Sequence, residues 1–280
     1  MGVKVVTDSG ADITPEAAKP LGITVVPVYL RFGDKVYRDG VDIGPDEFYT
    51  KLMSSSVHPF TSAPSAGDFA QTYREVARHT DQIVSIHITR RHSGTYDAAL
   101  LGKKMAEETG CRIEVIDSQG VTMWQGLVAL AAARAAEAGY ELYQVVEEVH
   151  EAIRQMRALA LLGTVRYAVQ GGRIGKAIST VESILNLKAL LTLRNGELRP
   201  AGLVRTRGKG IERLREFMRS AFPIEELAIV YSTTPEDAQK LADYVASLLP
   251  NMVPAIVRLG PALGVHAGPG ALIAVIRQAK

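Results

Sequence analysis

Cysteine is nearly absent from this chain of 280 residues, which contains only Cys111. A single cysteine excludes an internal disulfide framework and a zinc site built from cysteines. We expect Cys111 to be a small buried hydrophobic residue. The histidines show no metal-ligand spacing either. The sequence therefore predicts a protein without a resident metal or other cofactor.

Strong net charge and long apolar runs are missing as well. The net charge is +2, which gives no indication of nucleic-acid binding. The uncharged run Ser118–Ala133 falls short of the ~20 residues that a membrane-spanning helix needs. The chain enters a strand-like run at Val3–Thr7 without a signal-peptide pattern. We therefore expect a soluble, cytoplasmic, globular protein.

Motifs for nucleotide hydrolysis are also lacking. The sequence has no Gly-x-x-x-x-Gly-Lys-Ser/Thr loop and no kinase catalytic-loop pattern. Asp8, Asp97 and Asp117 occur singly, without a paired spacing that would hold magnesium. We therefore expect that this chain is not an enzyme and does not transfer phosphate by itself.

Alternating strands and helices fill the first 162 residues. This alternation favours a mainly parallel sheet covered on both faces, hence an N-terminal α/β/α domain of three layers at 1–162. The expected strands are Val3–Thr7, Val25–Leu30, Gln82–Ile88 and Arg112–Ile116. The expected helices are Ala66–Arg78, the run from Ser93 to Glu108, Thr122–Ala138 and Glu141–Met156.

Strand-like runs come in groups from about residue 160 onwards. Asn195-Gly196 is a strong hairpin signal between two of them. This grouping predicts a C-terminal α/β domain with a mixed sheet at 163–280. Its expected strands are Ala158–Thr164, Ala189–Leu193, Glu197–Leu198, Gly202–Thr206, Leu227–Tyr231, Val253–Leu259 and Ala271–Ile276.

Small, hydroxylated loops lie beside the expected strand ends of the first domain. Ser93-Gly94-Thr95 stands where a strand turns into a helix, and the first amides of a helix can hold an anion. Because ligands of open α/β sheets collect at the carboxyl ends of strands, these loops predict a shared cleft. The loops are Asp8-Ser9, Thr61–Ser65, Ser93–Thr95 and Asp117-Ser118.

Two glycine-rich segments stand out in the second domain. Gly171-Gly172-Arg173 places an arginine where it can grip an oxyanion at close range. Gly264–Gly270 surrounds His266 with glycines and a proline, which predicts a rigid loop open to close contact. Both segments are candidates for binding a carboxylate or a phosphate.

Together these segments resemble the DegV family of fatty-acid-binding proteins. The matching segments run in the family's order from one end of the chain to the other. They are Thr7-Asp8-Ser9, Thr61–Ser65, Ser93–Tyr96, Ile116-Asp117-Ser118, Gly171–Ile174, Val204–Arg207 and His266–Gly270.

The resemblance implies two domains with a long-chain fatty acid buried in a tunnel between them. It also implies a separate fatty-acid kinase, related to dihydroxyacetone kinases, that phosphorylates the bound acid for phospholipid synthesis. An anionic membrane surface is expected as a transient partner, nucleic acid is not, and the chain is expected to be a monomer. The head-group residues that the resemblance implies are Thr61, Ser62, Ser93, Gly94, Arg173 and His266.

The sequence departs from the family pattern at several positions. Ala63 stands where glutamine is usual and His92 where leucine is common, so both bear on acyl-chain preference. Ala168-Val169-Gln170 replaces a segment that usually carries lysines, which bears on docking to the kinase.

A basic stretch of the second domain suggests where a partner docks. From Gly163 to Ser220 there are 12 Lys and Arg against 4 Asp and Glu. Clustered cations favour an acidic protein surface or anionic lipid headgroups. Arg205 and Arg207 are the best candidates for docking.

Two other functions stay open on the sequence alone. The anion-suited loops fit a phosphate- or nucleotide-binding regulator. Ser93, with His266 and either Asp8 or Asp117, fits a Ser-His-Asp hydrolase, although Ser93 is not in a Gly-x-Ser-x-Gly elbow.

Overall fold

The computed structural model describes residues 2–173 and 187–279. The chain forms two compact units. The first comprises Met1–Tyr29 and Thr61–Arg154, and the second comprises Leu30–Phe60 and Gln155–Lys280. The chain therefore passes from one unit to the other three times. The domain boundary predicted at residue 162 stays a prediction.

A parallel sheet of four strands, in the order β2-β1-β6-β7, forms the centre of the first unit. Its strands are β1 (Lys4–Asp8), β2 (Thr24–Val26), β6 (Gln82–His87) and β7 (Arg112–Asp117). Strand β6 is buried along its whole length, as a central strand covered on both faces should be. The register pairs Thr7 with Ile86 and His87 with Asp117, so these strands end nearly level.

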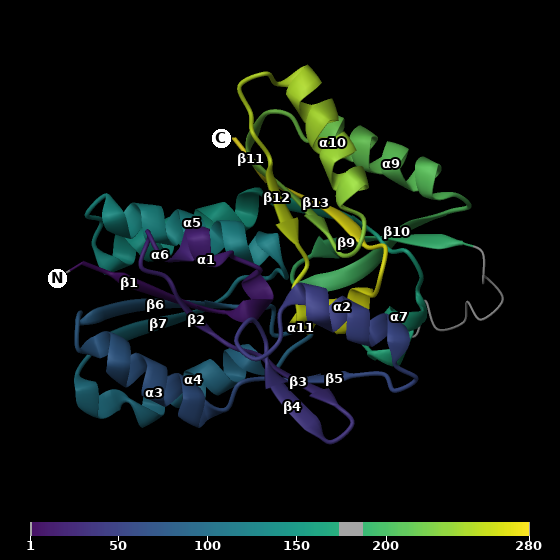
Figure 1. Ribbon diagram of the computed structural model, residues 1–280. Helices are drawn as coiled ribbons and strands as arrows, with labels where there is room; N and C mark the ends of the chain where they lie inside the picture. The colour runs from purple at the N-terminus through teal and green to yellow at the C-terminus, as the bar shows by residue number, and fades with distance from the viewer. Residues whose placement is uncertain (1, 174–186, 280) are drawn as a thin grey trace. The chain divides into compact units, whose positions relative to one another are not determined.

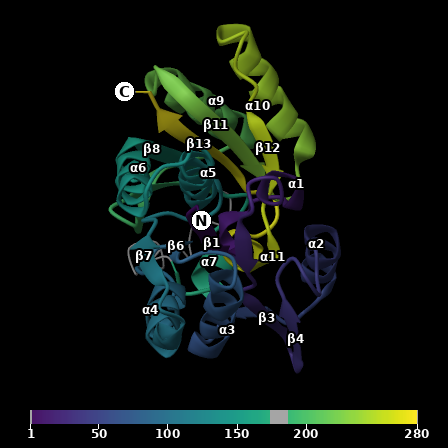
Figure 2. The same cartoon turned by 90° about the vertical axis from the view of Figure 1, so that its left-hand side faces the viewer.

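Helices cover both faces of this sheet (Figures 1 and 2). One face carries α3 (Ala66–Ala77) and α4 (Thr95–Met105), and the other carries α5 (Met123–Glu137) and α6 (Leu142–Gln155). A Cβ on Gly102 of α4 would lie 2.5 Å from the Cβ of Phe69, so glycine there lets α3 and α4 pack closely. Shorter elements are η1 (Ser9–Ala11), α1 (Pro15–Ala18) and η2 (Glu107–Thr109). The predicted α/β/α layering is confirmed.

The second unit contains a mixed sheet of six strands in the order β10-β9-β8-β13-β11-β12. Only the β11–β12 pair is parallel in this sheet of the described chain. Its strands are β8 (Met156–Leu161), β9 (Lys188–Arg194), β10 (Glu197–Val204), β11 (Ile224–Tyr231), β12 (Ala255–Arg258) and β13 (Leu272–Gln278). Helices α9 (Arg207–Ser220) and α10 (Pro235–Leu248) bury Leu214, Met218 and Leu241 in the core of this unit. The predicted mixed sheet is confirmed.

The predicted hairpin at Asn195-Gly196 is confirmed, with φ of 52° and 77° at its two residues. Strand β10 is continuous, whereas the sequence indicated two separate runs. The interruption between Pro200 and Gly202 is a shift of register within one strand. Proline and glycine weaken the sequence signal for a strand, although a bulge accommodates both.

A smaller sheet, in the order β4-β3-β5, accompanies three helices of the second unit. The strands are β3 (Tyr29–Phe32), β4 (Lys35–Arg38) and β5 (Phe60–Ser62), and the helices are α2 (Pro45–Ser54), α7 (Arg166–Gln170) and α11 (Pro261–Ala267). The expected strand Val25–Leu30 is divided between β2 and β3. Pro27, which has no amide hydrogen, lies between the two strands.

Helix α11 corrects the first part of the loop expected at Gly264–Gly270, since residues 264–267 are helical and 268–270 lie after the helix. His266 lies in the last turn of this helix, and the chain leaves it at Gly268, whose φ is 70°. A Cβ on Gly264 would lie 2.5 Å from the Phe48 ring, so glycine here allows close packing against α2. At Gly264 the glycine therefore serves close packing within a helix, whereas Gly268 and Gly270 serve the turn that follows it.

Candidate functional site

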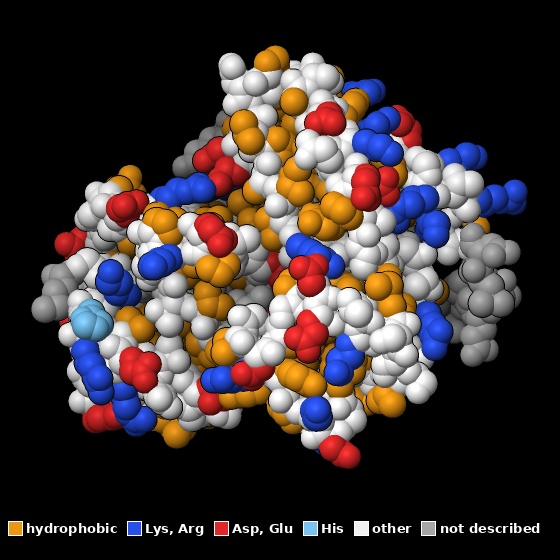
Figure 3. Space-filling view, in the orientation of Figure 1, with side chains coloured by type: hydrophobic (Ala, Val, Ile, Leu, Met, Phe, Trp, Pro, Cys, Tyr) orange, Lys and Arg blue, Asp and Glu red, His pale blue; other side chains and the backbone are white. Residues whose placement is uncertain are grey.

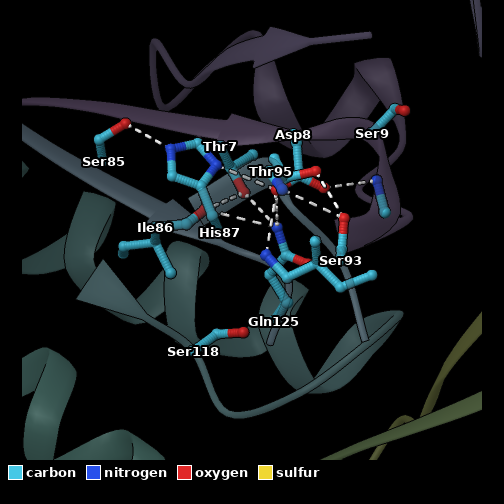
Figure 4. Close-up of polar contacts among 12 residues, drawn as sticks. Thr7, Asp8, Ser9, Ser85, Ile86, His87, Ser93, Thr95, Ser118 and Gln125 are labelled. Carbon is cyan, nitrogen blue, oxygen red and sulfur yellow. Dashed lines mark hydrogen bonds and ion pairs between the residues drawn. The ribbon is translucent and has the colours of Figure 1, made fainter. Parts of the chain in front are cut away.

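Three strand ends of the first unit meet along one edge of the parallel sheet. Asp8, His87 and Asp117 are the last residues of β1, β6 and β7. The segments that follow them are Ser9–Ala11, the loop into α4 and the loop into α5 (Figure 4). Asp8-Ser9, Ser93–Thr95 and Asp117-Ser118 therefore share the carboxyl edge of the sheet, where ligands of α/β proteins collect.

Asp8 is fully buried, and hydrogen-bond donors surround its carboxylate. Oδ1 accepts a hydrogen bond of 3.0 Å from the Gly10 amide. Oδ2 accepts from the Ile88 amide at 3.0 Å and from Gln125 Nε2 at 2.9 Å, and His87 Nδ1 lies 3.0 Å away. These contacts tie the turn after β1 to the start of the loop that carries Ser93 (Figure 4).

His87 continues this network away from the sheet edge. Its Nε2 lies 2.7 Å from Ser85 Oγ, and Ser85 Oγ lies 2.9 Å from the hydroxyl of Tyr73. All four side chains from Asp8 to Tyr73 are fully buried. The two ring nitrogens of His87 thus contact Asp8 and Ser85, and Ser85 links the imidazole to Tyr73. Burial raises the pKa of Tyr73, although its hydrogen bond with Ser85 acts in the opposite direction.

Sequence reasoning missed His87 and Gln125 as parts of this edge. In the sequence, His87 is one of several histidines without metal-ligand spacing. Gln125 lies in an apolar run that predicts a helix. A weak signal existed, because Ser85 and His87 place polar side chains at alternate positions of a mainly apolar strand. In a fully buried strand such polar residues must find partners.

Backbone strain gathers at the same edge. Among the described residues, four that are not glycine have a positive φ, and one of these, Asn195, forms the hairpin. The other three are Asp12 at 53°, Gln119 at 53° and Thr122 at 51°. A β-branched residue such as Thr122 rarely adopts this conformation. Strain of this kind is common where loops are held for binding.

Ser93 and Gly94 lie at the start of α4. Ser93 Oγ is 2.8 Å from Thr95 Oγ1 and accepts a hydrogen bond of 3.3 Å from the Thr95 amide. Gly94 is the N-cap, its backbone is exposed, and a Cβ there would meet nothing within 4 Å. The chain itself therefore leaves open space at Gly94, which suits the close approach of an anion to the helix start.

Thr61 and Ser62 lie on β5, just before α3. Thr61 is half-buried and Ser62 is exposed. Ser65 of the same loop caps α3, since its Oγ accepts from the Asp68 amide at 3.1 Å while its own amide donates to Asp68 Oδ2 at 2.8 Å. The hydroxyl of Ser65 therefore stabilises a helix, and the role of Thr61 and Ser62 in binding a ligand stays a prediction.

Arg173 and His266 come together around Gly171 in the second unit. Arg173 Nη1 donates a hydrogen bond of 2.7 Å to the carbonyl of Gly171. A Cβ on Gly171 would lie only 2.1 Å from His266 Nδ1. Gly171 therefore allows the imidazole to approach the backbone, a role that the sequence did not assign. Ile174 of the same motif lies outside the described residues.

The two residues predicted to dock a partner differ in their surroundings. Arg205 is exposed after β10, whereas Arg207 at the start of α9 is half-buried and pairs with Asp237. Lys and Arg side chains gather over α9 and β10 (Figure 3). The docking role of both arginines stays a prediction.

The structure thus places the predicted head-group residues in two sets. Thr61, Ser62, Ser93 and Gly94 belong to the first unit, and Arg173 and His266 to the second.

Among the residues described, no group of three or more His, Cys, Asp or Glu could hold a metal ion. Over the same residues, no helix is long and apolar enough to span a membrane.

Comparison with known proteins decides the family. The model of the DegV family of uncharacterised proteins matches residues 2–278. The chain belongs to the DegV family. A DegV domain-containing protein of Caldanaerobacter subterraneus is 32% identical over 272 residues, which cover 96% of each chain. The resemblance found in the sequence is therefore confirmed.

Solved structures of DegV proteins share the fold over the full length. A structure from Thermus thermophilus, described as fatty acid binding of a DegV family protein, matches with a TM-score of 0.90, 30% identity and complete coverage of both chains. A stearic acid-binding protein from Eubacterium ventriosum matches with a TM-score of 0.91 and 27% identity over 98% of each chain.

Proposed function

We propose that this chain binds a long-chain fatty acid between its domains, 1–162 and 163–280, and presents the carboxylate to a separate fatty-acid kinase. The observation that carries the proposal is the likeness over almost the whole chain to two solved structures, one described as fatty acid binding of a DegV family protein and the other as a stearic acid-binding protein. The kinase partnership rests on the resemblance of the motifs.

In this proposal the two sets of polar residues share the head group. The hydroxyls of Thr61, Ser62 and Ser93 and the exposed backbone at Gly94 supply hydrogen bonds from the first unit. His266 and Arg173 supply them from the second. Such donors hold a carboxylate while one oxygen stays available as a nucleophile towards ATP.

The acyl tail supplies most of the affinity. Each buried CH₂ contributes ~0.8 kcal/mol, so a tail of sixteen carbons gains roughly 10 kcal/mol before ordering costs. One hydrogen bond to a charged group contributes about 1.5–3 kcal/mol. The tail therefore decides how tightly the acid binds, and the head group decides its orientation.

The surroundings of Asp8 argue against the version of the hydrolase alternative in which Asp8 is the aspartate. A Ser-His-Asp hydrolase built from Ser93 and His266 needs an aspartate to orient the histidine. Asp8 is fully buried and already bonded to Gly10, His87, Ile88 and Gln125. No observation specifically favours a nucleotide-binding regulator. The test below would reveal this function through the mass of the bound ligand.

Mass spectrometry of the purified chain tests the binding proposal. We expect a fatty acid of 14–18 carbons in the organic extract, because an acid held by its buried tail would stay bound during purification. Native mass spectrometry of the same sample gives the mass of the bound species. A nucleotide mass, or a preparation that is free of fatty acid and takes up none on incubation, would overturn the proposal.

An assay with ATP and Mg²⁺ tests the division of labour. We expect acyl-phosphate from oleate or palmitate only when a fatty-acid kinase related to dihydroxyacetone kinases is added. Equal rates with and without the kinase would show that this chain is itself the enzyme.

A further inference from the structure

Arg207 is the most completely bonded arginine of α9. Its guanidinium donates to three groups in three directions. Nε bonds Asp237 Oδ2 at 2.5 Å, Nη2 bonds Thr234 Oγ1 at 2.7 Å, and Nη1 bonds the carbonyl of Gly270 at 2.7 Å. The side chains of Arg207 and Asp237 are only 26% and 18% exposed. This arginine therefore joins the start of α9 to the start of α10 and to the segment after α11.

Other arginines of α9 have ordinary surface contacts. Arg213 and Arg215 form ion pairs with Glu216 and Glu212, three residues away on the same helix, at 3.1 and 3.5 Å. Pairs of this kind contribute little to structure. The comparison shows that the position of Arg207, and not its residue type alone, gives it a connecting role.

The carbonyl that Arg207 binds belongs to the short segment 268–270, which begins two residues after His266. Gly268 and Gly270 have φ of 70° and 77°, a conformation that side chains disfavour. The Gly270 amide donates to Thr233 Oγ1 at 3.0 Å. A Cβ on Gly163 would lie 2.4 Å from the Pro269 carbonyl, so the chain just after β8 packs closely against the same segment. The segment is therefore fixed on several sides, with Arg207 as its charged contact.

His266 depends on this segment because it lies only two residues before Gly268, in the last turn of α11. Its imidazole also lies against Gly171, where no Cβ would fit. A rotation at the end of α11 would move the ring relative to that backbone. The bond from Arg207 to Gly270 limits such a rotation.

We infer that Arg207 is a positioning residue for the carboxylate site, which holds the 268–270 segment and thereby the orientation of His266. The inference rests on the proposed function for the role of His266, but its structural half stands by itself. Lysine cannot replace arginine here, because one ammonium group cannot donate along three fixed directions of a planar fork.

The first test observes His266 directly. We would record the imidazole signals of the chain labelled at histidine, assign His266 with the His266→Gln variant, and compare wild type with Arg207→Lys, Asp237→Asn and the control Arg213→Lys. We expect the His266 signals to shift, and their pH titration to change, in Arg207→Lys and Asp237→Asn but not in the control. Signals of His266 that coincide in Arg207→Lys and wild type would refute the inference.

The second test separates positioning from docking. Phosphorylation by the kinase should fall roughly ten- to a hundredfold in Arg207→Lys through kcat, since small misplacements of a reacting group have effects of this size. The affinity for fluorescent fatty acid should change less than about threefold, because the tail dominates binding. A lower rate that comes entirely from a higher KM for the kinase, with unchanged His266 signals, would assign Arg207 to docking and overturn the inference.

The two tests also separate this inference from the proposed function. If wild type bound no fatty acid, the proposed function would fail, while the His266 signals would still report on Arg207. If wild type bound fatty acid normally and the signals did not respond to Arg207→Lys, only the present inference would fail.

Discussion

At the scale of single residues, the buried carboxylate of Asp8 sets the strictest requirement in the first unit. An acceptor with no exposed surface needs donors on both oxygens, because an unpaired buried charge is very costly. Two backbone amides, a histidine and a glutamine meet this requirement. The same contacts fix the positions at which β1 and β6 end and the following loops begin.

Replacing Asp8 should therefore cost more stability than its small change in size suggests. Asp8→Asn places an NH₂ group among donors, and we expect a loss of about 3 kcal/mol in the free energy of unfolding. The matched control is Asp97→Asn, whose side chain is 58% exposed and pairs with Arg90 at 3.4 Å. The control should stay within about 0.5 kcal/mol of wild type. Urea unfolding measures both, and equal losses would contradict the role given to Asp8.

Asp117, at the end of β7, should make stability depend on pH. Burial raises its pKa, and the hydrogen bond from the Gln119 amide offsets part of this effect. The folded state therefore favours the protonated carboxyl. The stability that the folded state gains by binding a proton at Asp117 is fully present below the pKa of the unfolded state. It is lost as the pH rises through the raised pKa of the folded state.

The Asp117→Asn variant should lack this dependence. We expect it to be more stable than wild type at pH 7, with a difference that shrinks towards pH 4. Urea unfolding across this range gives the measurement, and Glu114→Gln, an exposed position on the same strand, is the control. A difference that stays constant with pH would show that Asp117 is not the group responsible.

At the scale of elements, the loop before α3 separates two uses of serine. Ser65 forms a capping box with Asp68, whereas Ser62 is exposed on β5. We expect Ser65→Ala to lower the free energy of unfolding by ~1 kcal/mol and to leave phosphorylation of the bound acid unchanged. Ser62→Ala should do the opposite. Thermal unfolding beside the coupled kinase assay distinguishes them, and the reverse assignment would move the head-group site to Ser65.

The elements that sequence reasoning predicted well are those whose own periodicity is strong. Strands β1, β6 and β7 and helices α3 to α6 follow from alternation and helical spacing, and the hairpin follows from Asn195-Gly196. The helix α11 did not follow, because its Gly264 is required by close packing against Phe48, a contact that the local sequence does not show. Long-range contacts of this kind override local signals.

The residues of the candidate site also divide into those with a local sequence signal and those that only long-range contacts bring together. Ser93 and Gly94 were predictable because a helix start with a hydroxyl and a glycine is a local pattern. The bond between His87 and Asp8 was not, because it joins residues 79 positions apart. Gly171 and His266 are almost 100 positions apart, and only the fold brings them into contact.

At the scale of the whole molecule, the excess of positive charge over α9 and β10 offers a test of partner docking. Arg205 is the better probe, since it is exposed and Arg207 is bound to Asp237. We expect Arg205→Glu to raise the KM for the kinase and to weaken its dependence on salt. Lys240→Glu, an exposed position on α10, gives the same change of net charge as a control. Identical salt dependence in all three proteins would rule out docking through Arg205.

The second unit is built from two segments that are far apart in the sequence, and this has a consequence for synthesis on the ribosome. Leu30, Phe32 and Phe48 are made early, but their buried cluster includes Val265, which is made more than 200 residues later. At the usual 5–20 residues per second, these apolar side chains wait roughly 10–40 s for their partner. Strand β13 also comes last, yet it lies between β8 and β11. The nascent chain should therefore be a client of chaperones until its final strand emerges.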